Sequence, residues 1–112
     1  MSNIEYNITD LNSLAAGVGS GIRNVIVTNV NDHVVRHSVM TEVYPWHFHP
    51  NADETFLVLE GTLLIDLEDR SVELNTGQLF TVPRQVKHRT RPKHTRSVNI
   101  TIERADTETV FC

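Results

Sequence analysis

The sequence has little cysteine and no long hydrophobic run. Cys112 is the single cysteine among 112 residues, so no intrachain disulfide can form, which fits a reducing compartment. Nothing around that thiol marks it as a nucleophile. No stretch approaches the ~18 consecutive apolar residues of a membrane span, and the first residues lack the basic start and apolar run of an export signal. These absences predict a cytoplasmic protein with no membrane partner.

Length and composition indicate one globular domain. Single domains commonly run ~100 to 150 residues, so we expect residues 1–112 to form one domain with one core. Apolar residues make up 39% of the chain and charged residues 21%, which is ordinary for a globular protein.

The net charge of -4 is unevenly distributed. Residues 84–96 contain six lysines and arginines and no acid, so this segment carries +6 and leaves -10 for the remainder. The segment has no aromatic residue to stack on bases, and the acidic remainder would repel phosphates, so we expect no nucleic-acid partner. Two interpretations stay open: a charged strand edge that discourages aggregation, or a pocket mouth at which Arg84, Arg89 and Arg91 attract a small anion.

Period-2 alternation of apolar and polar residues recurs along most of the chain and predicts an all-β fold. Turn signals such as Asn31-Asp32 and Gly61 separate the alternating segments. Many short strands at this spacing are typical of a barrel or jelly roll. Residues 8–17 are the one candidate helical turn, with Thr9 or Asp10 as cap. The expected strands are Ile22 to Val30, His33 to Met40, Val43 to His49, Glu54 to Glu60, Thr62 to Leu67, Ser71 to Leu74, Leu79 to Val82, Gln85 to Thr90 and Arg96 to Glu103.

The segment WHFHPNADETFLVLEG, residues 46–61, carries residues suited to a metal. His47 and His49 are two apart, so on a strand they project from the same face, about 6 to 7 Å apart, and their imidazoles can converge on one cation. Glu54 follows a short turn and can return a carboxylate from the next strand. His88 is the best-placed distant candidate for a further ligand.

These residues resemble the two motifs of the cupin superfamily. The first motif, G-x5-H-x-H-x3,4-E-x6-G, is matched by His47, His49, Glu54 and Gly61, with Thr41 in place of the opening glycine. The second, G-x5-P-x-G-x2-H-x3-N, is matched by the residues Gly77, Pro83 and His88, with Gln85 and Pro92 in place of the middle glycine and the final asparagine. The resemblance covers about residues 36–103.

The resemblance implies a double-stranded β-helix, which is a jelly-roll-like cupin barrel with a metal inside. Its ligands would be His47, His49, Glu54 and His88, and small cupins of this kind are often homodimers. Imidazoles and a carboxylate suit one divalent transition metal, which could be Fe, Mn, Ni, Cu or Zn, whereas the absence of thiolates disfavours a closed structural zinc site.

Inward-facing strand positions predict the cavity. Tyr44 and Trp46 are expected on the face opposite His47, packing between sheets or at a dimer contact. His33 and His37 are interpreted as structural residues of one strand face. Counting in twos from the ligands gives a largely apolar small-molecule site whose residues could also be plain barrel core: Val43, Pro45, Phe56, Val58, Val86 and Thr90.

Two classes of function follow from these residues. The first is a metal-dependent enzyme, a dioxygenase or a sugar isomerase or epimerase, acting on a small molecule that is neutral or anionic. The predicted cavity contains no uncommitted Asp, Glu, Lys or Tyr, which weakens proton-transfer chemistry relative to oxidation. The second is a non-catalytic module that binds or senses a small molecule or a metal.

Overall fold

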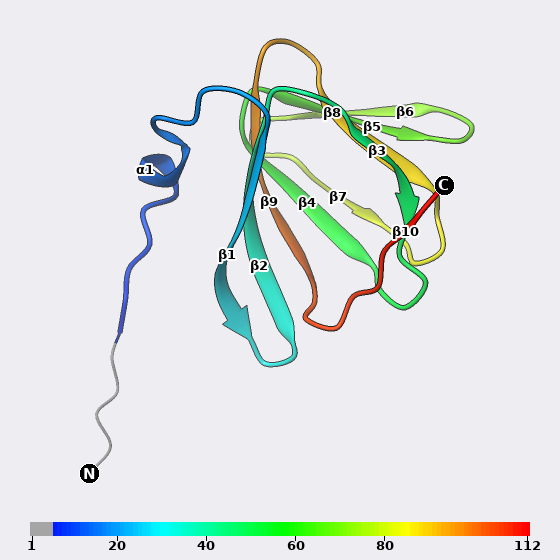
Figure 1. Ribbon diagram of the computed structural model, residues 1–112, viewed down its shortest axis with the longest axis horizontal. Helices are drawn as coiled ribbons and strands as arrows, with labels where there is room; N and C mark the ends of the chain where they lie inside the picture. The colour runs from blue at the N-terminus through cyan, green and yellow to red at the C-terminus, as the bar shows by residue number, and fades with distance from the viewer. Residues whose placement is uncertain (1–5) are drawn as a thin grey trace.

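The computed structural model describes residues 6–112 as a short helix followed by antiparallel strands (Figure 1). No helix in residues 6–112 is long and apolar enough to cross a membrane. The helix α1 spans Leu11–Ala15, and Asp10 caps it by accepting hydrogen bonds from the backbone N–H groups of Asn12 and Ser13. The strands are β1 (Ile22–Val30), β2 (His33–Met40), β3 (Tyr44–Phe48), β4 (Glu54–Glu60), β5 (Thr62–Leu67), β6 (Ser71–Asn75), β7 (Leu79–Val82), β8 (His88–Pro92), β9 (Ser97–Arg104) and β10 (Val110–Phe111).

The strands form two five-stranded sheets that face each other. The first sheet has the order β1-β2-β9-β4-β7 and the second the order β10-β3-β8-β5-β6. From β2 onward the chain passes from one sheet to the other at every connection except the β5–β6 hairpin, so β3 and β8 belong to the second sheet and β4 and β9 to the first. This arrangement confirms the predicted all-β double-stranded β-helix. Ligands that the chain supplies from β3, β4 and β8 can therefore meet between the sheets.

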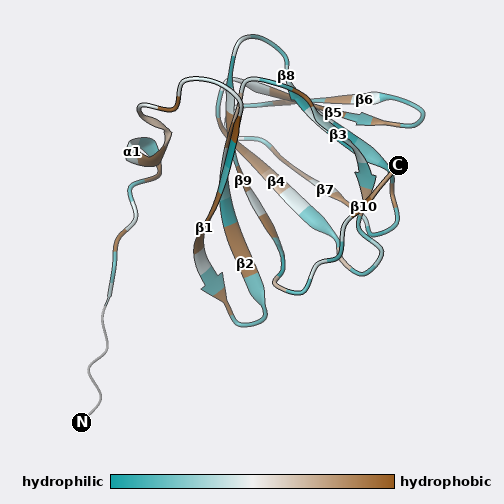
Figure 2. Cartoon of the chain, in the orientation of Figure 1, coloured by the Kyte–Doolittle hydropathy of each residue, from teal (hydrophilic) through white to brown (hydrophobic). Residues whose placement is uncertain are grey.

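Alternation along the strands builds the core between the sheets. Figure 2 shows hydrophobic and hydrophilic residues following one another along β1 and β2. At the closed end of the barrel, apolar side chains from both sheets pack together and exclude water, which contributes ~1.5 to 3 kcal/mol for each fully buried large side chain. This cluster consists of Met40, Phe56, Val58, Leu63, Ile65, Leu74 and Val82.

A second, smaller cluster joins α1 to the outer face of the first sheet. Ala15 of α1 packs with Val39 of β2 and Val98 of β9. Arg96 fastens the helix end, because its guanidinium donates to the carbonyl oxygen of Ala15 at 2.9 Å. The same face of β2 carries His37, which is only 2% exposed, as expected for a structural histidine. Burial lowers the pKa of His37, so the ring stays neutral at pH 7.

Two turns stand at positions where the cupin motifs have glycine. The chain keeps glycine at position 61 and has glutamine at position 85. Gly61 has φ +74°, and a Cβ there would lie 2.5 Å from the carbonyl oxygen of Arg96, so only glycine fits. Gln85 has φ 72° although it stands where the motif has glycine. Its backbone N–H donates to the carbonyl oxygen of His49 at 2.9 Å, which holds this residue in a turn. The strand expected to start at Gln85 therefore begins at His88.

The basic segment forms ion pairs on the outer surface. Asp66 of β5 is buried and accepts from the Nε atoms of Arg89 and Arg91 at 2.7 and 2.9 Å. The Arg89 guanidinium lies 5.3 Å from the Trp46 ring centroid, on the side of the sheet away from His47. Arg84 pairs with Asp53 at 3.7 Å. Arg84, Arg89 and Arg91 pair with acids and are not among the residues that line the cavity, so the structure does not favour the hypothesis that they attract an anion at the pocket mouth.

Replacing Asp66 by asparagine should remove this anchor between β5 and β8. Hydrogen bonds from Arg91 hold the pKa of the Asp66 carboxyl well below its usual range. A depressed pKa in the folded state stabilises the protein above about pH 4, and this stabilisation is lost as the pH falls further. We expect Asp66→Asn to lower the free energy of unfolding by about 2 kcal/mol at pH 7 and by less below pH 4.

Urea unfolding of both proteins from pH 3 to pH 8 measures this difference. Asp69→Asn, which changes an exposed acid of the adjacent turn, is the matched control and should have little effect. A constant difference between wild type and Asp66→Asn across that pH range would contradict the assignment.

Replacing Gln85 by glycine should stabilise the fold, because the left-handed conformation costs a non-glycine residue about 1 to 2 kcal/mol. The Gln85 side chain offers only a 3.3 Å hydrogen bond to the carbonyl oxygen of Pro50 in return. We expect Gln85→Gly to raise the free energy of unfolding by about 1 kcal/mol. Gln78→Gly, at an exposed position outside the positive-φ set, should instead lower it by about 1 to 2 kcal/mol, because it adds backbone freedom and removes the hydrogen bond that the Asn75 N–H donates to Gln78 Oε1 at 2.9 Å. Equal destabilisation by both changes would refute this account.

Candidate metal centre and cavity

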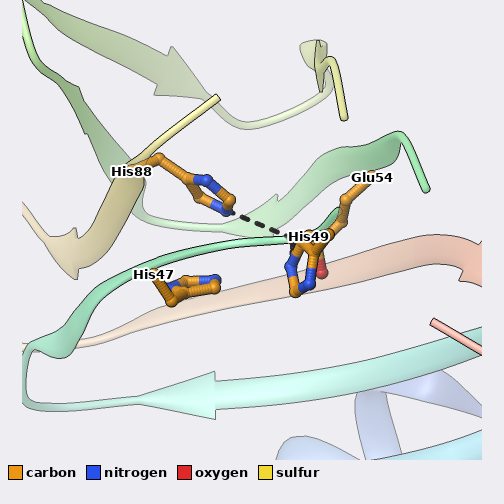
Figure 3. A group of neighbouring side chains, drawn as sticks. All are labelled: His47, His49, Glu54 and His88. Atoms are coloured by element: carbon orange, nitrogen blue, oxygen red, sulfur yellow. Dashed lines mark hydrogen bonds and ion pairs between the residues drawn. The ribbon is translucent and has the colours of Figure 1, made fainter. Parts of the chain in front are cut away.

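Three histidines and a glutamate meet between the two sheets. His47 and His49 come from β3 and the residue after its end, His88 begins β8, and Glu54 begins β4 of the opposite sheet. One ligand atom from each lies within 4.8 Å of all the others. Figure 3 shows the three rings and the carboxylate turned toward a common point. All four side chains are buried, with His88 fully so.

A bulge in β3 sets the direction of these side chains. Tyr44 pairs with Thr90 and His47 pairs with His88, so three steps along β3 match two steps along β8. Paired residues face the same side of a sheet, so Tyr44 and His47 both point inward despite their odd separation. The rings of Tyr44 and His47 meet edge to face, with centroids 4.9 Å apart. The prediction that Tyr44 lies opposite His47 is therefore wrong, whereas Trp46 does lie on the outer face under Arg89.

Backbone carbonyls fix the orientation of each histidine. The Nδ1 atoms of His47 and His88 lie 2.7 and 2.9 Å from the carbonyl oxygens of Pro45 and Val86. The Nδ1 atom of His49 lies 2.9 Å from the carbonyl oxygen of Glu108. A carbonyl can only accept, so each Nδ1 carries the hydrogen, and each Nε2 of a neutral ring presents a lone pair to the centre. This is the arrangement by which proteins orient metal-binding histidines.

The centre thus gathers acceptors that need a cation. Glu54 Oε1 lies 3.2 Å from His49 Nε2 and 3.5 Å from His88 Nε2. His88 Nε2 is buried and has no hydrogen-bond partner among residues 6–112. A proton on His49 can satisfy Glu54, but the other rings still present lone pairs. A divalent metal would satisfy all of these atoms together, so the residues present fit such an ion.

Electrostatics keeps His47 and Glu54 in their metal-binding forms, whereas the Glu54 carboxylate favours a proton on His49. Burial lowers the pKa of His47 to about 4, so this ring is neutral at pH 7. Burial alone would raise the pKa of Glu54, but the hydrogen bonds and charges of His49 and His88 lower it below its usual value. Burial alone would lower the pKa of His49, but the Glu54 carboxylate raises it. Glu54 is therefore an ionised carboxylate facing imidazoles.

A cavity of about 370 Å³ opens beside the centre. His47, His49 and Glu54 line it, while His88 lies behind them. This volume suits a small molecule. The remaining lining side chains come mainly from β1, β2 and β9 and are largely polar: Ile22, Asn24, Arg36, Ser38, Met40, Tyr44, Phe56, Thr90, Asn99, Thr101, Glu103, Thr107 and Thr109.

The predicted cavity residues divide into three groups. Phe56 and Thr90 line the cavity. Val58 is in the apolar core, and Val86 packs against that core. The inward placement predicted for Val43 and Pro45 is wrong: Val43 is 47% exposed and precedes β3, and Pro45 is exposed within the bulge. Counting in twos failed for them because the bulge shifts the alternation between Tyr44 and His47.

Three polar side chains line the cavity that were not predicted there from the sequence: Tyr44, Arg36 and Glu103. Burial raises the pKa of both Tyr44 and Glu103 above their ordinary values. A bulge gives no clear signal in one sequence, so Tyr44 could not be placed. Alternation along β2 and β9 could have identified the other two, because Arg36 shares the face of Met40, and Glu103 that of Asn99.

Comparison with known proteins agrees with this geometry. A family model described as "Cupin domain" matches residues 35–101. YdbB of Bacillus subtilis (strain 168), an uncharacterized protein, is 44% identical over 89 residues, which cover 79% of this chain and 78% of YdbB. Protein SchB of Streptomyces halstedii is 31% identical over 81 residues, which cover 72% of this chain and 51% of SchB.

The solved structures agree as well. A cupin-2 domain containing protein from Shewanella frigidimarina NCIMB 400 superposes with a TM-score of 0.80 at 25% identity, covering 87% of this chain and 94% of the other. The four clustered residues lie within the segment that the family model matches. The chain therefore belongs to the cupin family.

Proposed function

We propose that this protein is an enzyme that uses one divalent transition metal, held by His47, His49, Glu54 and His88, to act on a small molecule. The observation that carries the proposal is the convergence of three oriented imidazoles and a carboxylate within 4.8 Å at the edge of a cavity. When bound, the ion would supply a Lewis acid beside the substrate. The choice among Fe, Mn, Ni, Cu and Zn depends on geometry and supply.

The other cavity groups favour proton transfer over oxidation. The Tyr44 phenol, whose ring packs against His47, can donate a hydrogen bond to substrate. Glu103 supplies a carboxyl group in the same cavity and is held by Arg36, whose Nε donates to it at 3.1 Å. An acid and a base on one cavity are what isomerisation or epimerisation requires in addition to a metal. The reaction class we propose is therefore an isomerase or epimerase type, with a dioxygenase as the alternative.

The first experiment measures metal content. Protein purified without chelator or affinity tag should contain close to one divalent metal per chain by elemental analysis. His88→Ala removes a ligand and should weaken metal affinity by at least about 100-fold, which is the upper end of the effect of losing an outer-shell partner. His94→Ala, which removes an exposed histidine of the basic segment, is the control and should keep full occupancy. Unchanged uptake in His88→Ala would contradict the proposed ligand set.

The same preparations separate the classes of function. The metal-loaded protein is incubated with phenolic, diketone and sugar-acid compounds while oxygen uptake and product formation are followed. Product without oxygen uptake, lost in Tyr44→Phe at unchanged metal content, would support proton transfer. Substrate-dependent oxygen uptake would identify a dioxygenase. Saturable binding without product would identify a binding module, which is the second candidate because a buried polar cavity also suits recognition without turnover.

We also propose that the protein forms a homodimer. Apolar residues stand exposed on the outer face of the first sheet, with Leu79 at 64% and Ile102 at 42%, and Val30 of edge strand β1 is 56% exposed. Pairing two copies would cover this surface and the edge of β1. Light scattering at micromolar concentration should give twice the 12.7 kDa chain mass, and Ile102→Lys should shift the mass toward one chain. A wild-type protein of single-chain mass would contradict the dimer.

A further inference from the structure

The inner face of β9 presents a row of polar groups to the cavity. Asn99, Thr101 and Glu103 occupy alternate positions of this strand and line the cavity. They are almost fully buried, with exposed fractions of 1%, 3% and 8%. Their strand neighbours in the first sheet include apolar Phe56, which pairs with Thr101. We call these three residues the β9 row.

Each member of the β9 row has a buried polar atom without a partner. Within the part of the chain that the structure describes, Asn99 Oδ1, Thr101 Oγ1 and Glu103 Oε2 make no hydrogen bond. The other carboxylate oxygen of Glu103 accepts from Arg36 Nε, so Oε2 remains for another donor. Buried polar groups are nearly always hydrogen-bonded, because leaving one unsatisfied costs stability. Such a row on one cavity wall indicates groups kept for a ligand.

The chemistry of the row selects the ligand's functional groups. An amide oxygen and a carboxylate oxygen only accept, and a threonine hydroxyl can accept as well, so the ligand must bring hydrogen-bond donors. Ammonium groups are donors, but they carry a positive charge. Arg36 and a divalent ion together carry more positive charge than Glu54 and Glu103 carry negative charge, so they would repel a cation from the cavity. Hydroxyl groups are donors without charge. They are therefore the groups that the row accepts best.

The dimensions select the ligand's size. Residues two apart on a strand are about 6 to 7 Å apart, so a molecule of monosaccharide size can reach two neighbouring members of the β9 row at once. The cavity of about 370 Å³ beside it holds a small molecule. We propose that the β9 row recognises the hydroxyl groups of a monosaccharide-sized polyhydroxy compound, neutral or anionic. This inference rests on the proposed function, because the proposed metal ion is one of the positive charges that disfavour a cationic ligand.

The test compares ligands that differ only in hydroxyl groups. Zinc-loaded protein is titrated calorimetrically with D-gluconate, D-galactonate and D-mannonate, and with hexanoate, which has the same chain length and charge. We expect at least one sugar acid to bind tenfold or more tightly than hexanoate. Thr101→Val keeps the side-chain shape and should lower that affinity about three- to tenfold, the effect of one hydrogen bond, while hexanoate binding stays unchanged.

Controls separate this inference from the metal proposal. Thr28→Val makes the same change at an exposed position of β1 and should leave sugar-acid affinity as in wild type. Zinc content measured in every variant shows whether the metal site itself has failed. Thr101→Val should also raise the melting temperature of the metal-free protein, because it removes an unpartnered buried hydroxyl. Hexanoate bound as tightly as all three sugar acids, or a lower melting temperature for Thr101→Val, would overturn the inference.

Discussion

At the candidate metal centre, acceptors from both sheets converge, and the donors of residues 6–112 satisfy them only in part. Glu54 approaches from the first sheet, and the Nε2 atoms of His49 and His88 approach it from the second at 3.2 and 3.5 Å. Backbone carbonyls accept hydrogen bonds from the Nδ1 atoms of the three rings, and these bonds hold each Nε2 toward the centre. A cation between the sheets would therefore stabilise the barrel as well as create reactivity, because its binding energy is available only to the folded chain.

Much of this could be predicted from the sequence, because the determinants are local. Alternation located nine strands to within a few residues, and the spacing of His47, His49 and Glu54 placed the ligands that now cluster. Turn chemistry likewise identified Gly61, whose φ of +74° favours glycine. These features depend on residues near one another in the chain, where period and spacing carry the information.

The failures have a different origin. Tyr44, Val43 and Pro45 were misplaced because a bulge interrupts the period of β3, and a bulge is visible only in the pairing of β3 with β8. The basic segment was misread because its partner Asp66 lies on another strand, where it binds Arg89 and Arg91. The two-residue strand β10 is too short to produce a pattern. Each error concerns contacts between distant segments, which one sequence does not display.

The hydrogen bond that orients the His49 ring comes from a residue outside the segment that the family model matches. Its Nδ1 partner is the carbonyl of Glu108, and β10 continues from there along β3, whereas the family model ends at residue 101. Changes in this C-terminal segment could tilt one ligand without altering any of the four. The geometry of the four clustered residues thus depends on a backbone carbonyl beyond the matched segment, and chains with the same four side chains need not hold them at the same angles.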